Sequence, residues 1–120
     1  MEAIVAEFQK LQNTFQTTVE ARQRLDSQLS ENLQVKKEFD SLSSSNQIYK
    51  LIGPVLVKQD QTEAKSNVDK RIEFIKSEIE RVEKQLQDLN DKMEKKKVEI
   101  VALQTKAQEA QAGSGPAIAA

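Results

Sequence analysis

The side chains that could do chemistry in this chain are almost entirely carboxylates and lysines. Its 120 residues include 19 acidic and 18 basic side chains and a single tyrosine, but no cysteine or histidine. The chain therefore lacks the residues most often used as general base and as strong nucleophile, and it has no glycine-rich phosphate loop. No set of residues is spaced so that a nucleophile, a base and an orienting group would meet in one pocket. The sequence predicts a protein that is not an enzyme.

Metal, cofactor and nucleic-acid binding are disfavoured by the same composition. A metal site would have to be built from carboxylates alone, and no spacing argues for one, so we expect no metal and no cofactor. A net charge of −1 offers no basic face for nucleic acid. The one basic cluster, Lys92 with Lys95, Lys96 and Lys97, lies within a helical pattern. We interpret it as a solvated helix face in preference to a binding patch.

Membrane association and secretion are not expected either. No apolar run approaches the length of a membrane span. The acidic N-terminus lacks the continuous apolar stretch of a signal peptide. With no cysteine to form a disulfide framework, the default expectation is a cytoplasmic protein with no membrane partner.

Long helices must carry most of these side chains, because few aromatic residues (4%) and many charged ones (31%) are typical of a coiled coil. Apolar residues recur at steps of four and three from about Glu2 to about Ser43, and the pattern weakens at Thr18 and Arg22. The sequence predicts that serines and Asn46 end this helix.

A second helix is predicted from about Gln61 to about Ala112. Asp60 is placed as its N-cap, with Glu63 three residues on. Its apolar seam runs from Val68 to Ala110 in unbroken steps of four and three, with Lys96 as the single charged member. This period of 3.5 predicts left-handed supercoiling.

Between the two helices, Ile48 to Ile52 and Val55 to Lys58 are predicted to form a β-hairpin around Gly53-Pro54. Glycine can adopt the positive φ of a tight turn, and proline fixes φ at the next position. Both faces of this hairpin are apolar and both edges are open, so it needs strands from other chains. The predicted assembly residues are Ile48, Tyr49, Leu51, Ile52, Gly53, Pro54, Val55, Leu56 and Val57.

The predicted fold is mainly α: two long antiparallel helices form a coiled coil and are joined by one β-hairpin that pairs with other subunits. The expected segments are an N-terminal helix at 1–44, the hairpin element at 45–60, a C-terminal helix at 61–112 and a disordered tail at 113–120. If the flanks are symmetric about the turn, the numbers of facing residues sum to about 107. Phe15 is then expected near Met93.

The run from Tyr49 to Gln59, Tyr-Lys-Leu-Ile-Gly-Pro-Val-Leu-Val-Lys-Gln, resembles the hairpin of β-type prefoldin subunits. Arg71 and the run from Ile75 to Glu80 also fit that family. The resemblance implies a subunit of a hetero-hexamer of two α-type and four β-type subunits, whose hairpins build a β-barrel platform. It further implies an ATP-independent chaperone that binds unfolded clients, such as actin and tubulin, at the coiled-coil tips. Such a chaperone would pass its clients to the cytosolic group II chaperonin.

The ends of the helices far from the hairpin carry more apolar residues than one seam needs. Val5 adjoins Ile4 and Val101 adjoins Ile100, and neighbours on a helix point about 100° apart. We therefore predict a partly open client-binding surface, although several members could simply be seam residues. Its members are Ile4, Val5, Phe8, Leu11, Phe15, Ile100, Val101 and Leu103.

Three other residues favour structural roles. Lys96 and Arg22 are expected to extend their charges outward from the seam, and Tyr49 is expected to pack in the barrel. The alternative to a chaperone is a structural coiled-coil spacer or tether. That alternative would explain both helices but not the apolar hairpin.

Overall fold

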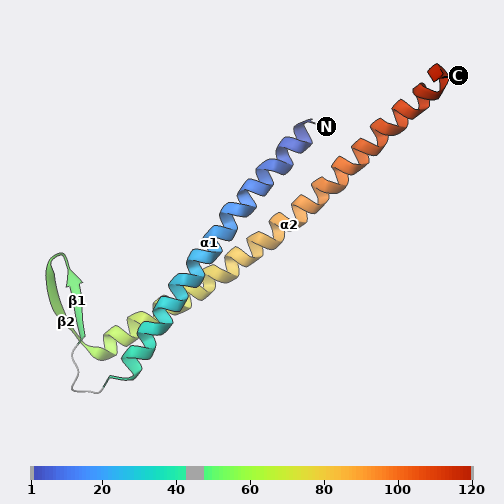
Figure 1. The fold of residues 1–120 in the computed structure, drawn as a ribbon. Coiled ribbons are helices and arrows are strands. Elements are labelled where there is room, and N and C mark those ends of the chain that lie inside the picture. The colour runs from blue at the N-terminus through green and yellow to red at the C-terminus, as the bar shows by residue number, and fades with distance from the viewer. Residues whose placement is uncertain (1, 43–47, 120) are drawn as a thin grey trace. The chain divides into compact units, whose positions relative to one another are not determined.

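The computed structural model describes residues 2–42 and 48–119, with side chains described as far as Gln111. The elements follow in the order α1 (Glu2–Asp40), β1 (Ile48–Ile52), β2 (Val55–Gln59) and α2 (Gln61–Ala119) (Figure 1). The predicted fold class, two long helices joined by an antiparallel β-hairpin, is confirmed. By its contacts the chain divides into a terminal unit, residues 1–20 with 84–120, and a hairpin unit, residues 21–83.

The hairpin unit has a buried seam supplied mainly by α2. Its buried residues are Ile48, Ala64, Val68, Ile72, Ile75, Ile79 and Val82. The α1 residues of this unit are at most half-buried, including Leu25, Leu29 and Phe39. Isoleucine and valine at steps of three and four therefore form the most tightly packed stripe, as the sequence predicts.

Two ion pairs fix how α1 and α2 face each other in the hairpin unit. Arg22 Nη2 lies 2.9 Å from Glu83 Oε1, and Lys36 Nζ lies 3.1 Å from Asp69 Oδ1. In both pairs the residue numbers sum to 105, two fewer than predicted. The connections are unequal, since residues 41–47 separate α1 from β1 whereas Asp60 alone separates β2 from α2.

The terminal unit packs more loosely. Among its described side chains none is buried, and those on the seam are half-buried. On α2 the half-buried positions are Leu86, Leu89, Met93, Lys96, Ile100 and Leu103.

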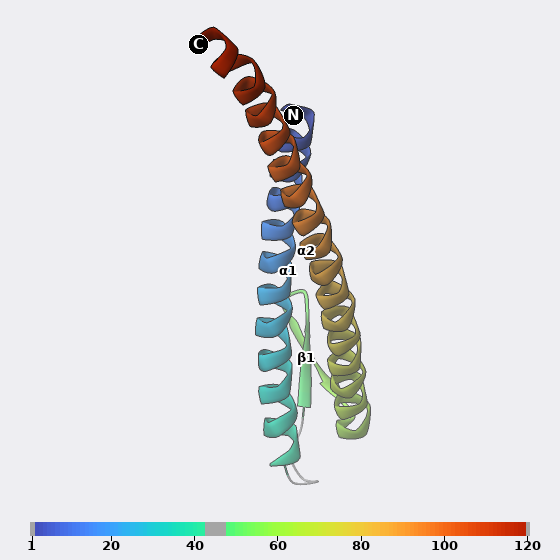
Figure 2. The same ribbon diagram turned by 90° about the vertical axis from the view of Figure 1, so that its right-hand side faces the viewer.

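The α2 seam ends earlier than the sequence indicates. Ala107 and Ala110, predicted as seam residues, are exposed. Glu7 contacts Lys96, and α1 begins only at Glu2, so α2 continues past the start of α1 (Figure 2). Beyond Leu103, the described side chains of α2, as far as Gln111, are exposed.

The ends of the helices differ from the predicted bounds. α1 stops at Asp40, where the Ser41 hydroxyl donates to the Glu38 carbonyl over 2.7 Å; Ser43 to Asn46 lie outside the described residues. α2 begins at Gln61 as predicted, and the Asp60 carbonyl accepts from the Ala64 amide at 2.9 Å.

The predicted end of α2 near Ala112 is wrong, because the helix continues to Ala119. Extending a helix adds one hydrogen bond per residue and needs no new nucleus, so an established helix can continue through residues that would not start one. Disorder of the tail in solution stays a prediction.

Candidate functional site

The turn of the hairpin has the geometry that its sequence predicts. Gly53 has φ +57°, and no other described residue has a positive φ. Ile52 pairs with Val55, which leaves Gly53 and Pro54 as the two turn residues. A positive φ followed by the negative φ of proline is the pattern of a type II′ turn, whose twist matches that of the flanking strands.

The strand pairing sorts the hairpin side chains onto two faces. Tyr49, Leu51 and Leu56 share one face, because Leu51 pairs with Leu56 and Tyr49 pairs with Lys58. The opposite face carries the remaining apolar residues: Ile48, Ile52, Val55 and Val57. Each face therefore presents at least three apolar side chains, as predicted.

Nearly all of this apolar surface is open to solvent. Tyr49, Leu51, Ile52, Val55, Leu56 and Val57 are between 42% and 66% exposed. Ile48 is the exception, at 7%. Within the described part of the chain the sheet has only two strands, so one edge of each strand has no backbone partner. A surface of this kind is characteristic of an interaction element.

The eight residues predicted to bind clients all lie in the terminal unit. Seven of them, including Val5, are half-buried, whereas Val101 is 59% exposed. Val101, which adjoins the seam residue Ile100, is thus exposed as expected, whereas Val5 beside Ile4 is half-buried. Whether these residues bind clients stays a prediction.

Sequence reasoning did not single out four exposed apolar residues, Leu33 and Val35 on α1 and Phe74 and Val98 on α2. Phe74 is 64% exposed in the hairpin unit, and Val98 is 68% exposed in the terminal unit. Both lie off the α2 seam, and Phe74 could have been found in the same way as Val101, because it adjoins the seam residue Ile75. Val98 and Val101 are three residues apart and therefore neighbours on one face of the helix.

Both charged residues on the seam form ion pairs with the facing helix. Lys96 Nζ lies 2.7 Å from Glu7 Oε2 and 3.4 Å from Glu99 Oε2. The hydrogen bond from Lys96 lowers the pKa of Glu7, and the same bond raises the pKa of Lys96. Arg22 pairs with Glu83 on the facing helix and with Asp26 on its own helix. The hydrogen bond to Asp26 is the main cause that raises the pKa of Arg22.

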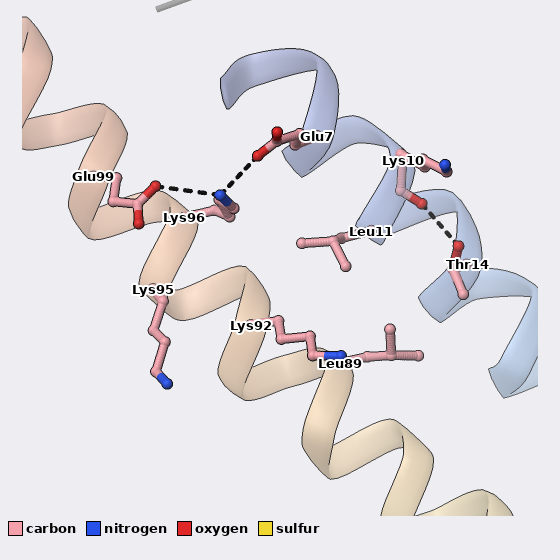
Figure 3. Close-up of a pocket in the computed structure, with 9 residues that line it drawn as sticks. All are labelled: Glu7, Lys10, Leu11, Thr14, Leu89, Lys92, Lys95, Lys96 and Glu99. Carbon is pink, nitrogen blue, oxygen red and sulfur yellow. Dashed lines mark hydrogen bonds and ion pairs between the residues drawn. The ribbon is translucent and has the colours of Figure 1, made fainter. Parts of the chain in front are cut away.

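Two grooves flank the seam of the terminal unit. The first, of about 510 Å³, contains Leu11 and Leu89 together with several lysines (Figure 3). The second, of about 260 Å³, contains Phe8, Phe15 and Met93. Phe15 and Met93 thus lie together, as the predicted register requires.

The part of the chain that the structure describes lacks two kinds of feature. None of the helices described is long and apolar enough to cross a membrane. Within those same residues, no three acidic side chains gather where they could hold a metal ion.

Comparison with known proteins agrees with this architecture. The family model described as Prefoldin subunit matches residues 2–107. A chain with one hairpin between two long paired helices, matched over that length, belongs to the prefoldin family.

Within this family the chain is similar to proteins named Prefoldin subunit 6. The protein from Saccharomyces cerevisiae is 43% identical over 97% of this chain and 98% of its own length. The one from Mus musculus is 43% identical over 93% of this chain and 88% of its own. The protein from Arabidopsis thaliana is 44% identical over 90% and 84% respectively. The resemblance to β-type prefoldin subunits that the hairpin sequence indicates is therefore confirmed.

Solved structures share the fold. The prefoldin beta subunit from Thermococcus strain KS-1 matches with a TM-score of 0.78 over 85% of this chain and 90% of its own, at 24% identity. The beta2 subunit from the same strain matches with a TM-score of 0.65 over 79% and 99%, at 26% identity.

Proposed function

We propose that this chain is a subunit of a hexameric, ATP-independent prefoldin complex that holds unfolded proteins. The observation that carries the proposal is the hairpin, whose two faces together leave six large apolar side chains exposed. A two-stranded hairpin is marginally stable by itself in water. Strands from neighbouring subunits would pair with its open edges and cover both faces, as in a β-barrel platform.

The proposed partners are further prefoldin subunits, two α-type and three other β-type. The similarity to proteins named Prefoldin subunit 6 supports this choice. The proposed complex works in the cytoplasm without enzymatic chemistry. It receives unfolded or nascent chains, such as actin and tubulin, and delivers them to the group II chaperonin.

Clients are proposed to bind at the terminal unit, where the helix pair is loosely packed. Its seam residues are half-buried, and Val98 and Val101 are exposed on α2. Apolar side chains that are already partly exposed to solvent lose few contacts when they turn toward a client. Their burial against the client is favourable. A structural spacer is disfavoured, because a spacer needs only a polar turn in place of the apolar hairpin.

A triple variant tests client binding. Val5→Ser, Phe8→Ser and Val101→Ser together should weaken suppression of client aggregation several-fold while leaving assembly intact. Light scattering of a chemically denatured client, with the assembled complex present, measures the effect.

The matched control removes three apolar residues from the hairpin unit: Leu33→Ser, Val35→Ser and Phe74→Ser. These side chains are all exposed, so the control should suppress aggregation as well as the wild type. Equal suppression by all three proteins would show that the terminal unit is not the client-binding surface.

A further inference from the structure

The first groove of the terminal unit combines an apolar floor with a cationic rim. Leu11 of α1 and Leu89 of α2 lie between the helices, as Figure 3 shows. Four lysines also line this groove: Lys10, Lys92, Lys95 and Lys96. Lysine can lay its aliphatic stem along apolar surface while its ammonium group stays in water. Such a groove can therefore hold an apolar side chain and meet a charge beside it.

The acidic groups at this groove do not neutralise its lysines. Its only two carboxylates, Glu7 and Glu99, both contact Lys96. The four lysines and two glutamates give a formal charge of +2. Lys92 is paired outside the lining, 3.1 Å from Asp88. Within the described part of the chain, Lys10 and Lys95 have no carboxylate within ion-pair distance.

The second groove of the same unit has a formally neutral lining, in contrast to the +2 of the first. Its apolar lining is Phe8, Phe15 and Met93, and its only charges are Glu94 and Lys97, which pair at 3.4 Å. The two grooves have no lining residue in common. Of the lysine cluster at residues 92–97, Lys97 lines the neutral groove and the other three line the cationic one.

We propose that the cationic groove selects client segments in which apolar residues are interleaved with aspartate or glutamate. This inference rests on the proposed function and names the class of segment that the terminal unit prefers. An acidic segment would place apolar side chains on Leu11 and Leu89 and its carboxylates beside Lys10 and Lys95. Those two ammonium groups are available, since neither must first release an internal partner.

Three labelled peptides with the same apolar residues test the proposal. They differ only in the interleaved residue, which is Asp, Asn or Lys, and fluorescence anisotropy measures their binding to the assembled complex. The Asp peptide should bind most tightly and the Lys peptide most weakly. Raising the salt from about 50 mM to about 500 mM should shrink this difference, because exposed charges are screened.

A double variant locates the effect in the groove. Lys10→Gln with Lys95→Gln should weaken binding of the Asp peptide about three- to tenfold, as expected for losing two exposed ion pairs. It should leave the Asn peptide unchanged. The matched control is Lys84→Gln with Lys106→Gln, the same charge change on two exposed lysines of the terminal unit outside both grooves. The control should change binding of the Asp peptide by less than about twofold.

Two results would overturn the inference while the proposed function stands. One is equal binding of the Asp and Asn peptides, with the Asn peptide still competed by a denatured client. The other is equal weakening by both double variants, which would indicate general attraction to charge. Failure of the complex to bind any peptide or to suppress aggregation would reject the proposed function together with the inference.

Discussion

At the scale of single residues, Lys96 shows how this coiled coil accommodates a charge on its seam. The sequence places Lys96 among twelve apolar residues, and the structure turns its ammonium group toward Glu7 on the facing helix and Glu99 on its own. The lysine remains half-buried, so its stem takes part in the seam. An apolar residue there would pack better, whereas Lys96 with Glu7 specifies which residues of the two helices face each other.

The contribution of this pair should depend on pH. The Lys96 hydrogen bond lowers the pKa of Glu7, so the pair stabilises the terminal unit fully above the ordinary titration range of glutamate. That stabilisation is lost as the pH falls through the lowered pKa. Glu7→Gln should therefore give a slightly lower Tm than the wild type at about pH 7, and the difference should vanish once the pH lies below the lowered pKa of Glu7. Circular dichroism melts across this range measure it.

Glu109→Gln is the control for this titration, because Glu109 lies in the same unit and is exposed. Its Tm should follow that of the wild type at every pH. A Tm difference for Glu7→Gln that stays constant down to the most acidic buffer would contradict the assigned role of the ion pair.

At the scale of elements, the α2 seam was the most predictable feature and its end the least. The periodicity from Val68 to Leu103 translates directly into buried and half-buried positions. Ala107 and Ala110 continue the same pattern but are exposed. Whether a seam position is buried depends on the partner helix, and periodicity within one helix contains no information about where the other begins.

The hairpin turn could be predicted from the sequence, whereas the grooves between the helices could not. Gly53-Pro54 predicts the turn because the information is local: one positive φ and one fixed φ. The cationic groove depends on Lys10 meeting Lys92 and Lys95 from another helix, and this requires the register between helices. The predicted sum of 107 differs by two from the 105 of the ion pairs in the hairpin unit and by four from the 103 of Glu7 and Lys96 in the terminal unit.

Neighbouring residues of α2 provide a test of the seam. Ile75 is 4% exposed and Phe74 is 64% exposed. Ile75→Ala should lower the free energy of unfolding by about 2–4 kcal/mol, because it removes buried methyl groups and leaves a cavity. Phe74→Ala should change it by no more than about 0.5 kcal/mol. Urea titrations followed by circular dichroism measure both.

Similar losses from Ile75→Ala and Phe74→Ala would contradict the assignment of the seam. The larger side chain is removed in the exposed variant. If the loss of stability followed residue size and not burial, Phe74→Ala would therefore have the lower urea midpoint of the two variants.

At the scale of the whole molecule, most of the buried residues lie on α2, whereas much of the exposed apolar surface lies on β1 and β2. Among the described side chains, six of the seven that are buried lie on α2 in the hairpin unit. The hairpin of that same unit exposes six large apolar side chains that the chain does not cover. A two-stranded ribbon that is apolar on both faces requires other strands, and this requirement is the central claim of the account.

The most direct test of this claim is the mass of the complex formed when the chain is co-expressed with its partner prefoldin subunits. Leu51→Ser with Leu56→Ser removes a cross-strand pair from one hairpin face, where both side chains are exposed. The control, Phe74→Ser with Val98→Ser, removes two equally exposed apolar residues elsewhere. Sedimentation velocity should show a six-subunit particle for the wild type and the control, and mainly free chain for the hairpin variant. A six-subunit particle from the hairpin variant, or only free chain from the wild type, would contradict the account.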